Sequence, residues 1–325
     1  MMTPYPSTIW ALALPEAGFR SQVIGLAEAL HQPFILKNVN LKKPWSLMPV
    51  RFCPFSLMGL DAASDMLTPP WPDLVISCGR RTIPLALAIK RASGNKTLAV
   101  HIQDPKSATP LFDLVIPMTH DGAKGANVMQ VDTALHRITE EKLSEAASYW
   151  AHSFSELQRP LVGVILGGSN RTYRFTKDVA ERMITLLDQL HSSTGAYFYI
   201  AASRRTDDEA IHVFERFSKA ASHIRFWKGE GENPYLGILA LSDALIVTED
   251  SVSMISEALS TGKPVATFPL AGVSARHGLF IENLLNKGAV TRFDGTMPNA
   301  VSARIPNSTT IAANAVRQLL ASPRS

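Results

Sequence analysis

Short apolar runs alternate with amphipathic helical patterns along the chain, and no other feature constrains its fold as strongly. In the first half, Ser7–Ala13 is a strand-like run, and Ser21–Leu30 repeats apolar residues at helical spacing. In the second half, the apolar run Leu161–Leu166 precedes a helical pattern that begins at Thr176. Strands that alternate with helices of about ten residues build parallel sheets from βαβ units. We therefore predict an α/β fold.

The alternation is interrupted once, near Gln158–Pro160, where the chain becomes polar and reaches a proline. The chain has 325 residues, and a single hydrophobic core rarely grows beyond about 250–300 residues. We therefore expect two facing Rossmann-like domains, residues 1–158 and 159–325, with a cleft between them. The last amphipathic helix, near Thr309–Leu320, is placed to cross back over the junction. Open α/β sheets bind ligands beyond the carboxyl ends of their strands, so site residues are expected there.

Composition excludes several classes of protein. The formal net charge is +4, from 32 basic and 28 acidic residues, so nucleic acid is not an expected partner. The two cysteines, Cys53 and Cys78, form no C-x-x-C pair, and we interpret them as small core residues rather than a disulfide framework or zinc site. The nine histidines include no H-E-x-x-H motif, so no metal is predicted.

The sequence predicts neither a membrane-spanning helix nor a signal peptide. No apolar window reaches the roughly 18–20 residues that a membrane-spanning helix needs. The N-terminus has no basic segment before its first apolar run, so we expect no signal peptide. These features favour a cytoplasmic protein, with peripheral contact to the inner face of the membrane left open.

Two predicted strands of the second half end in loops that suit phosphate groups. In Gly167–Asn170, glycines let backbone N–H groups approach an anion, whereas the structural alternative is a tight turn. This loop matches neither the dinucleotide fingerprint nor the P-loop. In Ser203–Thr206, two adjacent guanidinium groups suit a diphosphate, whereas the alternative is a solvated basic turn. The predicted binding residues are Gly167, Gly168, Ser169, Asn170, Ser203, Arg204 and Arg205.

A third loop joins a strand to a helix near residue 250. Asp250 or Ser251 can cap the helix, which is the structural interpretation. The hydroxyl groups also lie beside free N–H groups and the positive end of the helix dipole, which together form an anion site. Glu257 can accept hydrogen bonds from sugar hydroxyls, as acidic residues do from ribose in dinucleotide folds. The predicted binding residues here are Thr248, Asp250, Ser251, Ser253 and Glu257.

The first half repeats this arrangement of strand ends. Gly79 and Arg80 follow one predicted strand, and Gln103 follows the next, so we predict that these three residues bind substrate. His120 and Asp121 follow another strand. A histidine beside a carboxylate is a general-base arrangement if both face a cleft, and a loop hydrogen bond otherwise. We predict His120 and Asp121 as the catalytic pair.

The run Val247–Val265 (VTEDSVSMISEALSTGKPV), together with Gly167–Asn170 and Ser203–Thr206, resembles the ELM family of bacteria and plants, which is named for mitochondrial fission. The resemblance covers nearly the whole chain, and further matching blocks are Cys78–Arg81, Gln103–Pro105, His120–Asp121, Gly125–Val128 and Asn233–Tyr235. The family is similar to GT-B glycosyltransferases, in which the second of two facing Rossmann-like domains holds most of a nucleotide-sugar. The resemblance implies that such a donor is surrounded by Gly168, Ser169, Arg204, Ser251, Ser253 and Glu257.

The leading hypothesis is therefore a metal-independent, inverting glycosyltransferase that uses a nucleotide-diphosphate-sugar as substrate and needs no cofactor. Arginines and the helix end at Ser251 would hold the leaving diphosphate, and His120 or Asp121 would activate the acceptor hydroxyl. The acceptor stays unknown, because the loop Pro15–Gln22 departs from the family pattern. An epimerase acting on the same donor class is an open alternative.

A non-catalytic scaffold that docks on membrane or division proteins is the other alternative. The segment Pro44–Leu60 is rich in Met and Phe and could form a lipid-facing patch. The same segment could instead cover the first sheet as core, and we favour that interpretation.

Overall fold

The computed structural model describes residues 8–48, 56–299 and 304–322. Cys53 and residues 49–55 of the apolar segment 44–60 lie outside these ranges. The chain divides into two compact units, one made of Met1–Arg137 with Pro306–Ser325 and the other of Ile138–Ile305. We call them unit 1 and unit 2. Among the described residues, no helix is both long and apolar enough to cross a bilayer.

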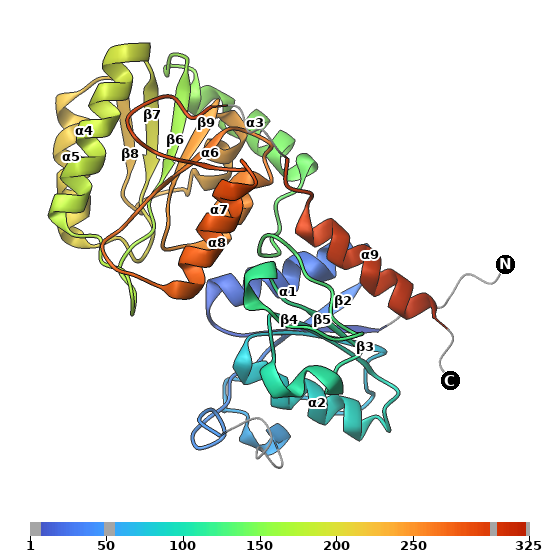
Figure 1. The fold of residues 1–325 in the computed structure, drawn as a ribbon. Coiled ribbons are helices and arrows are strands. Elements are labelled where there is room, and N and C mark those ends of the chain that lie inside the picture. The colour runs from blue at the N-terminus through green and yellow to red at the C-terminus, as the bar shows by residue number, and fades with distance from the viewer. Residues whose placement is uncertain (1–7, 49–55, 300–303, 323–325) are drawn as a thin grey trace. The chain divides into compact units, whose positions relative to one another are not determined.

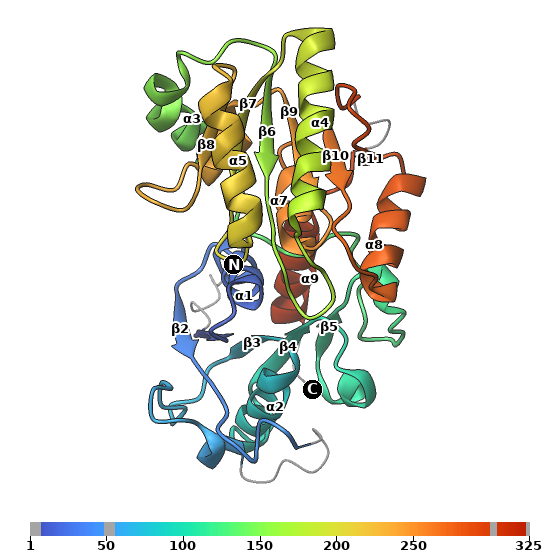
Figure 2. The ribbon, with the colours of Figure 1, turned by 90° about the vertical axis from the view of Figure 1, so that its left-hand side faces the viewer.

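In the described part of unit 1, five strands form a parallel sheet (Figure 1). The elements are β1 (Ile9–Ala13), α1 (Ala17–Ala29), β2 (Phe34–Asn38), η2 (Ser56–Gly59), β3 (Leu74–Cys78), η3 (Arg80–Thr82), α2 (Ile83–Ala92), β4 (Leu98–Ile102), η4 (Lys106–Leu111), β5 (Leu114–Ile116), η5 (Thr119–Asp121) and α9 (Ser308–Ala321). The strand order is β2-β1-β3-β4-β5. All residues of β1 and β3 are buried, as expected for central parallel strands with both faces covered. Helices α1 and α9 pack together on one face of the sheet, and α2 covers the other (Figures 1 and 2).

In the described part of unit 2, six strands form a second parallel sheet. The elements are α3 (Glu140–Phe154), β6 (Leu161–Ile165), α4 (Lys177–Thr194), β7 (Tyr197–Ala201), α5 (Asp208–Ala220), β8 (Ile224–Trp227), α6 (Tyr235–Leu241), β9 (Ala244–Thr248), α7 (Val252–Leu259), β10 (Val265–Phe268), α8 (Ala275–Asn286) and β11 (Thr291–Arg292). The strand order is β11-β10-β9-β6-β7-β8, so the direction of strand addition reverses between β6 and β9. Open α/β sheets bind ligands at such a reversal.

Different helices cover the two faces of the unit 2 sheet. Helices α4 and α5 lie side by side over one face (Figure 2), around a core that includes Phe198 and Phe214. Helices α3, α6, α7 and α8 supply the core of the other face, which includes Tyr199 and Ile238. Because each strand is buried on both sides, its sequence is a continuous apolar run rather than an alternating one. The predicted α/β class with two Rossmann-like sheets is therefore confirmed.

Helix α3, at the start of unit 2, shows where the chain is divided. Helix α3 packs on α6, where Gly237 approaches so closely that a Cβ atom would lie 2.5 Å from the Trp150 ring. Phe154 of α3 also contacts Tyr199, with ring centroids 4.7 Å apart. The predicted boundary at Gln158–Pro160 thus falls in the loop between α3 and β6, inside unit 2.

Helix α9 belongs by its contacts to unit 1, although it ends the chain. At its start, the Thr133 N–H donates to the Ser308 hydroxyl at 3.1 Å, and the His136 N–H donates to the Thr309 hydroxyl at 2.9 Å. Near its end, Arg317 donates to the Ala29 carbonyl at the end of α1. These polar contacts, added to the apolar packing on α1, hold the last helix against the first sheet.

Candidate functional site

The loops that follow β6 and β9 meet at the carboxyl edge of the unit 2 sheet. The Gly167 N–H donates to the Thr248 hydroxyl at 2.7 Å, and the Gly168 N–H donates to the Asp250 carboxylate at 3.1 Å. The Thr248 hydroxyl in turn donates to Asp250 at 2.7 Å. Because β6 and β9 are neighbours in the sheet, residues about eighty positions apart share one network.

The loop after β7 joins this network from the other side of β6. The hydroxyls of Ser203 and Thr206 both donate to the Gly167 carbonyl, at 3.0 and 2.5 Å. The Ser169 N–H donates to the Arg205 carbonyl at 3.0 Å, and the Ser169 hydroxyl donates to Asp207. The structure therefore brings together predicted residues from each of the three unit 2 loops, namely Gly167, Gly168, Ser169, Ser203, Arg205, Thr248 and Asp250.

Glycine is required at both positions of the Gly167–Gly168 pair because the loops approach so closely. A Cβ atom on Gly167 would lie 2.0 Å from the Asp250 carboxylate, and one on Gly168 would lie 1.7 Å from the Arg205 carbonyl oxygen. The N–H groups of both glycines, and that of Ser169, already donate to protein oxygens. These glycines therefore connect the loops, and their binding of an anion stays a prediction.

The charged groups of the site differ in how far they are neutralised. Asp250 is fully buried and forms an ion pair with Arg205 at 3.0 Å, and the Arg205 side chain is 43% exposed. The neighbouring Arg204 is exposed and has no ion pair or hydrogen bond with the described residues. Arg204 therefore offers a ligand at this edge a positive charge that no described carboxylate neutralises.

Helix α7 begins at the same edge. Of the two predicted caps, Ser251 is the one used, since its hydroxyl accepts the Met254 N–H at 3.4 Å. Ser253 is half-buried on the first turn. Glu257, expected to bind sugar hydroxyls, accepts a hydrogen bond from the Tyr235 hydroxyl, and burial together with this carboxylate raises the pKa of Tyr235 well above its usual value.

Asn170 has a local role in the structure. Its side-chain oxygen accepts the N–H groups of Thr172 and Tyr173, at 2.8 and 2.9 Å, and so shapes the turn after β6. The turn is then paired with the loop after β10: the Arg174 N–H donates to the Ala271 carbonyl at 2.7 Å, and the reverse bond is 3.1 Å.

The loop after β10 contributes residues that our sequence interpretation missed. The His277 ring, in the first turn of α8, stacks on Tyr173 with centroids 5.6 Å apart. Its buried Nδ1 has no hydrogen-bond partner among the described residues. Burial, and then Arg276, lower the pKa of His277, so its ring is neutral near pH 7. The strand-end rule that selected the other loops would have selected this one too, had it been applied after Phe268.

The predicted residues of unit 1 lie on several loops at the carboxyl ends of its strands. Gly79 has φ +85°, a conformation that favours glycine. Arg80 donates to the carbonyls of Leu47 and Met48, at 3.3 and 3.2 Å. Gln103 has φ +81°, and its N–H donates to the Ile116 carbonyl at 2.9 Å.

The predicted catalytic pair is buried. The His120 Nε2 and the Asp121 carboxylate lie 3.7 Å apart, and each side chain is only 2% exposed. Asp121 also accepts the Met118 N–H at 3.2 Å, which closes the turn of η5. The pair thus has a local structural role, and its catalytic role stays a prediction.

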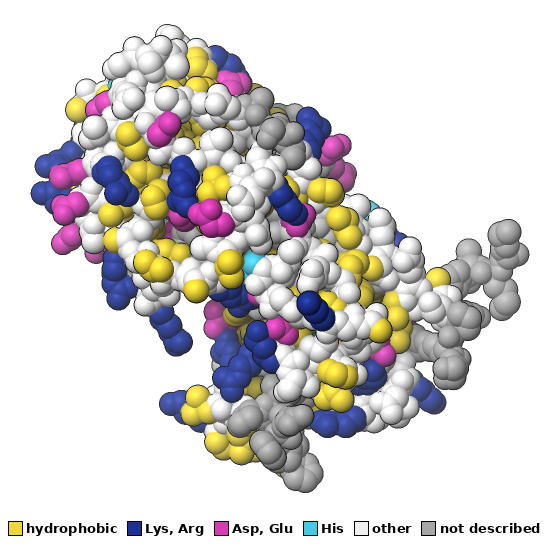
Figure 3. Space-filling model, viewed as in Figure 1, with side chains coloured by type: hydrophobic (Ala, Val, Ile, Leu, Met, Phe, Trp, Pro, Cys, Tyr) yellow, Lys and Arg dark blue, Asp and Glu magenta, His cyan; other side chains and the backbone are white. Residues whose placement is uncertain are grey.

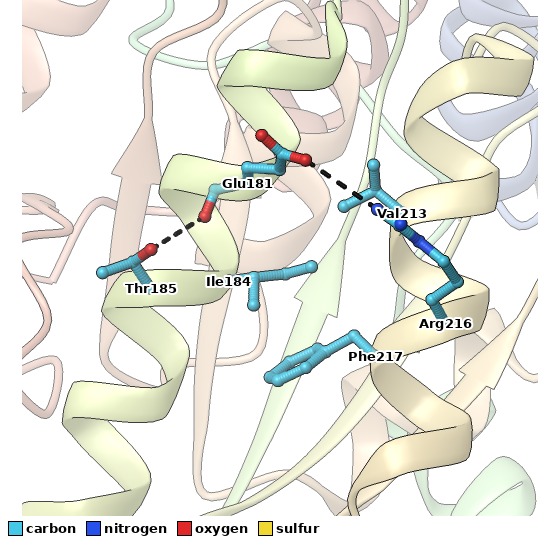
Figure 4. Close-up of a pocket in the computed structure, with 6 residues that line it drawn as sticks. All are labelled: Glu181, Ile184, Thr185, Val213, Arg216 and Phe217. Carbon is cyan, nitrogen blue, oxygen red and sulfur yellow. Dashed lines mark hydrogen bonds and ion pairs between the residues drawn. The ribbon is translucent and has the colours of Figure 1, made fainter.

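A surface pocket of about 420 Å³ lies between α4 and α5 (Figure 4). Arg216 of α5 reaches toward Glu181 of α4 across it, at 3.8 Å, with Val213 beside this pair and Ile184 and Phe217 below it. On α4, Lys177 also forms an ion pair with Glu181, at 3.6 Å. Figure 3 shows basic and acidic side chains intermixed over the surface of unit 2. Among the described residues, no three His, Cys, Asp or Glu side chains gather as metal ligands.

Comparison with known proteins gives the family and the fold. Residues 17–320 match the family Mitochondrial fission ELM1. The Arabidopsis thaliana protein Mitochondrial fission protein ELM1 is 32% identical over 275 residues, which are 77% of this chain and 64% of that relative. This chain thus spans less than two thirds of the plant protein's length.

Solved structures with the same fold share little sequence with this chain. UDP-GlcNAc 2-epimerase from Methanocaldococcus jannaschii has a TM-score of 0.60 at 12% identity, covering 96% of this chain and 99% of its own. MurG from Acinetobacter baumannii has a TM-score of 0.56 at 14% identity, covering 96% and 100%. The fold is therefore GT-B-like, and the sequence match confirms the predicted relationship: this chain belongs to the Mitochondrial fission ELM1 family.

Proposed function

We propose that the carboxyl edge of unit 2 binds a nucleotide-diphosphate-sugar and that the protein is a GT-B-type glycosyltransferase. The observation that carries the proposal is the convergence of the loops after β6, β7 and β9, with Arg204 exposed and without a partner among the described residues. A guanidinium group suits a diphosphate because it donates several hydrogen bonds in a fixed planar array. The M. jannaschii epimerase, which has this fold, was solved in complex with UDP-GlcNAc and UDP.

In this proposal, each group at the edge has a distinct task. Arg204 and the N-terminal end of α7 stabilise the negative charge that develops on the leaving diphosphate, in place of a metal ion. Asp250 does not touch the donor but fixes Arg205 and the Gly168 N–H. Glu257 reaches ribose or sugar hydroxyls while it holds Tyr235.

The proposed base that activates the acceptor hydroxyl comes from η5 of unit 1. His120 and Asp121 stay our proposed pair, but their 2% exposure means that the loop carrying them must open before an acceptor hydroxyl can reach either group.

Calorimetric titration with UDP-, GDP-, CMP- and ADP-sugars tests the donor site. We expect saturable binding of one nucleotide class, and about a tenfold weaker affinity for Arg204→Ala, the loss of one charge-assisted contact. Arg216→Ala is the matched control, because Arg216 is also exposed but lies on α5, outside the strand-end loops. The absence of heat with all four classes, in a folded sample, would contradict the proposal.

An epimerase is the second candidate, because UDP-GlcNAc 2-epimerases are among the solved structures with a similar fold. The two activities share the donor site but differ in what happens without an acceptor. Incubating the bound donor alone with the protein and following the sugar by NMR separates them: an isomerised sugar would favour the epimerase, and an unchanged one the transferase.

A further inference from the structure

A second pocket, of about 830 Å³, lies in unit 1 on segments to which the proposed function assigns no role. One wall is η4 with the residues that flank it, and the other is the segment 123–127. Two of the blocks that match the family, Gln103–Pro105 and Gly125–Val128, both contribute to the lining of this pocket, the first through Asp104 and the second through Gly125, Ala126 and Asn127. Its volume lies within the range of small-molecule sites, about 300–1,000 Å³.

Hydrogen bonds hold the two walls at a fixed separation. The Asn127 amide nitrogen donates to the carbonyls of Thr109 and Phe112, both at 2.8 Å. The Val115 N–H donates to the Asn127 carbonyl at 2.8 Å, so the second wall continues the sheet beyond β5. Hydrogen bonds of the backbone and of the Asn127 side chain thus fix the two segments that line the pocket.

One cation of the pocket is held in place by its own loop. Lys106 has φ +57°, and its ammonium group forms an ion pair with Asp104 at 2.7 Å. Asp104, whose side chain is 9% exposed, also accepts the Lys106 N–H at 2.7 Å. Left-handed non-glycine residues are uncommon, and they persist where the surrounding structure determines them, often at ligand sites.

The second cation, Lys124, comes from the opposite wall. Its side chain is exposed and has no ion pair with the described residues. The lining therefore carries two ammonium groups against one carboxylate, Asp104. This excess favours an anionic ligand that is held between the two walls.

The remaining lining combines hydroxyl and amide groups with an apolar floor. Ser107, Thr109 and the free amide oxygen of Asn127 can bond to ligand hydroxyls, while Pro110 and Phe112 offer apolar contact. We propose that this pocket binds a phosphorylated sugar or polyol, with the phosphate near Lys106 and Lys124. The inference does not depend on the proposed function, because this binding can be measured with no nucleotide-sugar present.

NMR titration of the full chain with glucose 6-phosphate tests the proposal. We expect saturable shifts in the amide signals of residues 104–112 and 123–127, with a Kd of about 1 mM or tighter. Glucose and inorganic phosphate, as separate probes, should each bind more weakly, because each offers only part of the contacts. Glucuronate, which carries a carboxylate instead, should also bind more weakly.

Two variants locate the binding. Lys124→Glu should weaken the affinity for glucose 6-phosphate at least about tenfold, and Ala126→Trp should block the pocket without removing a charge. Lys43→Glu is the matched control, since Lys43 is exposed on unit 1 but does not line the pocket. Circular dichroism checks that each variant is folded, and Ala126→Trp keeps the test decisive if Lys124→Glu unfolds.

Several outcomes would overturn the inference. The absence of saturable shifts with glucose 6-phosphate, or shifts confined to other residues, would remove the site. Equal affinities for Lys124→Glu and Lys43→Glu would show that the pocket cation is not involved. Glucuronate or inorganic phosphate binding as tightly as glucose 6-phosphate would refute the ligand class.

Discussion

The guanidinium group of Arg205 lies 3.0 Å from the carboxylate of Asp250, whose side chain is fully buried. The same carboxylate accepts hydrogen bonds from the Gly168 N–H and the Thr248 hydroxyl. One buried charge therefore ties together the loops after β6, β7 and β9. Because a buried carboxylate must be paired and hydrogen-bonded to be tolerated, the geometry of the whole edge depends on Asp250.

Replacement of Asp250 should destabilise the protein markedly. Asp250→Ala leaves two buried donors without an acceptor, and we expect a loss of about 2–4 kcal/mol in the free energy of unfolding. Denaturant-induced unfolding followed by circular dichroism measures the change. Asp208→Ala, at an exposed position in the first turn of α5, should cost no more than about 1 kcal/mol. Equal losses for the two variants would show that the buried network is not the cause.

Alanine substitutions at two glycines test how closely the loops after β6 and β7 pack together. Gly168→Ala should lower the melting temperature by many degrees, because its Cβ would lie 1.7 Å from a backbone oxygen that cannot move independently. Gly278→Ala, inside α8, should raise stability by up to about 1 kcal/mol, because apart from its chain neighbours and the helix backbone no described atom lies within 4 Å of the added Cβ. Differential scanning fluorimetry compares them. If Gly168→Ala left the melting temperature unchanged, the loops would have to be packed less closely than the structure shows.

Acid should destabilise the protein through His101. This ring is buried beside Ser77, with Nδ1 2.8 Å from the hydroxyl, and burial lowers its pKa from 6.5 to about 3, although Asp104 opposes the shift. The folded-state pKa is depressed, so the contribution of the neutral ring is fully present above pH 6.5 and is lost as pH falls toward about 3.

The variant His101→Phe isolates that contribution. Between pH 6.5 and 3 the wild-type free energy of unfolding should fall more steeply than that of the variant, by up to about 1.4 kcal/mol per pH unit for one proton. In the wild type the ring centroids of His101 and Phe112 are 5.0 Å apart. Phenylalanine at position 101 keeps an aromatic ring in this contact. Parallel pH profiles for the two proteins would argue against the buried neutral histidine.

The extent of unit 2 can be tested with fragments. We expect residues 138–305 to melt cooperatively, whereas residues 159–305 should not, because removal of α3 exposes the core under Trp150 and Phe154. Circular dichroism and near-ultraviolet spectra of the two fragments make the comparison. A cooperative transition in the shorter fragment would place α3 outside the folding unit.

Local sequence patterns predicted much of the fold. The runs Leu161–Leu166 and 244–247 contain no polar side chain, because parallel strands are buried on both faces. This pattern is visible in the sequence of each strand taken alone. The strand-end rule also found the three unit 2 loops that meet in the structure. The same rule also points to the loop after Phe268, which precedes His277, but only the structure shows that the His277 ring stacks on Tyr173.

The sequence by itself thus determined the α/β class, the approximate strands and helices, the family relationship and which residue types stand at strand ends, because each of these depends on neighbours along the chain. Only the tertiary structure decided that Arg205 pairs with Asp250, that Gly167 and Gly168 join loops, and that α9 packs on α1. Those contacts connect distant segments, and they follow from the order of strands in each sheet. The strand order depends on how all the segments of a unit pack together around its sheet. No single stretch of sequence contains that information.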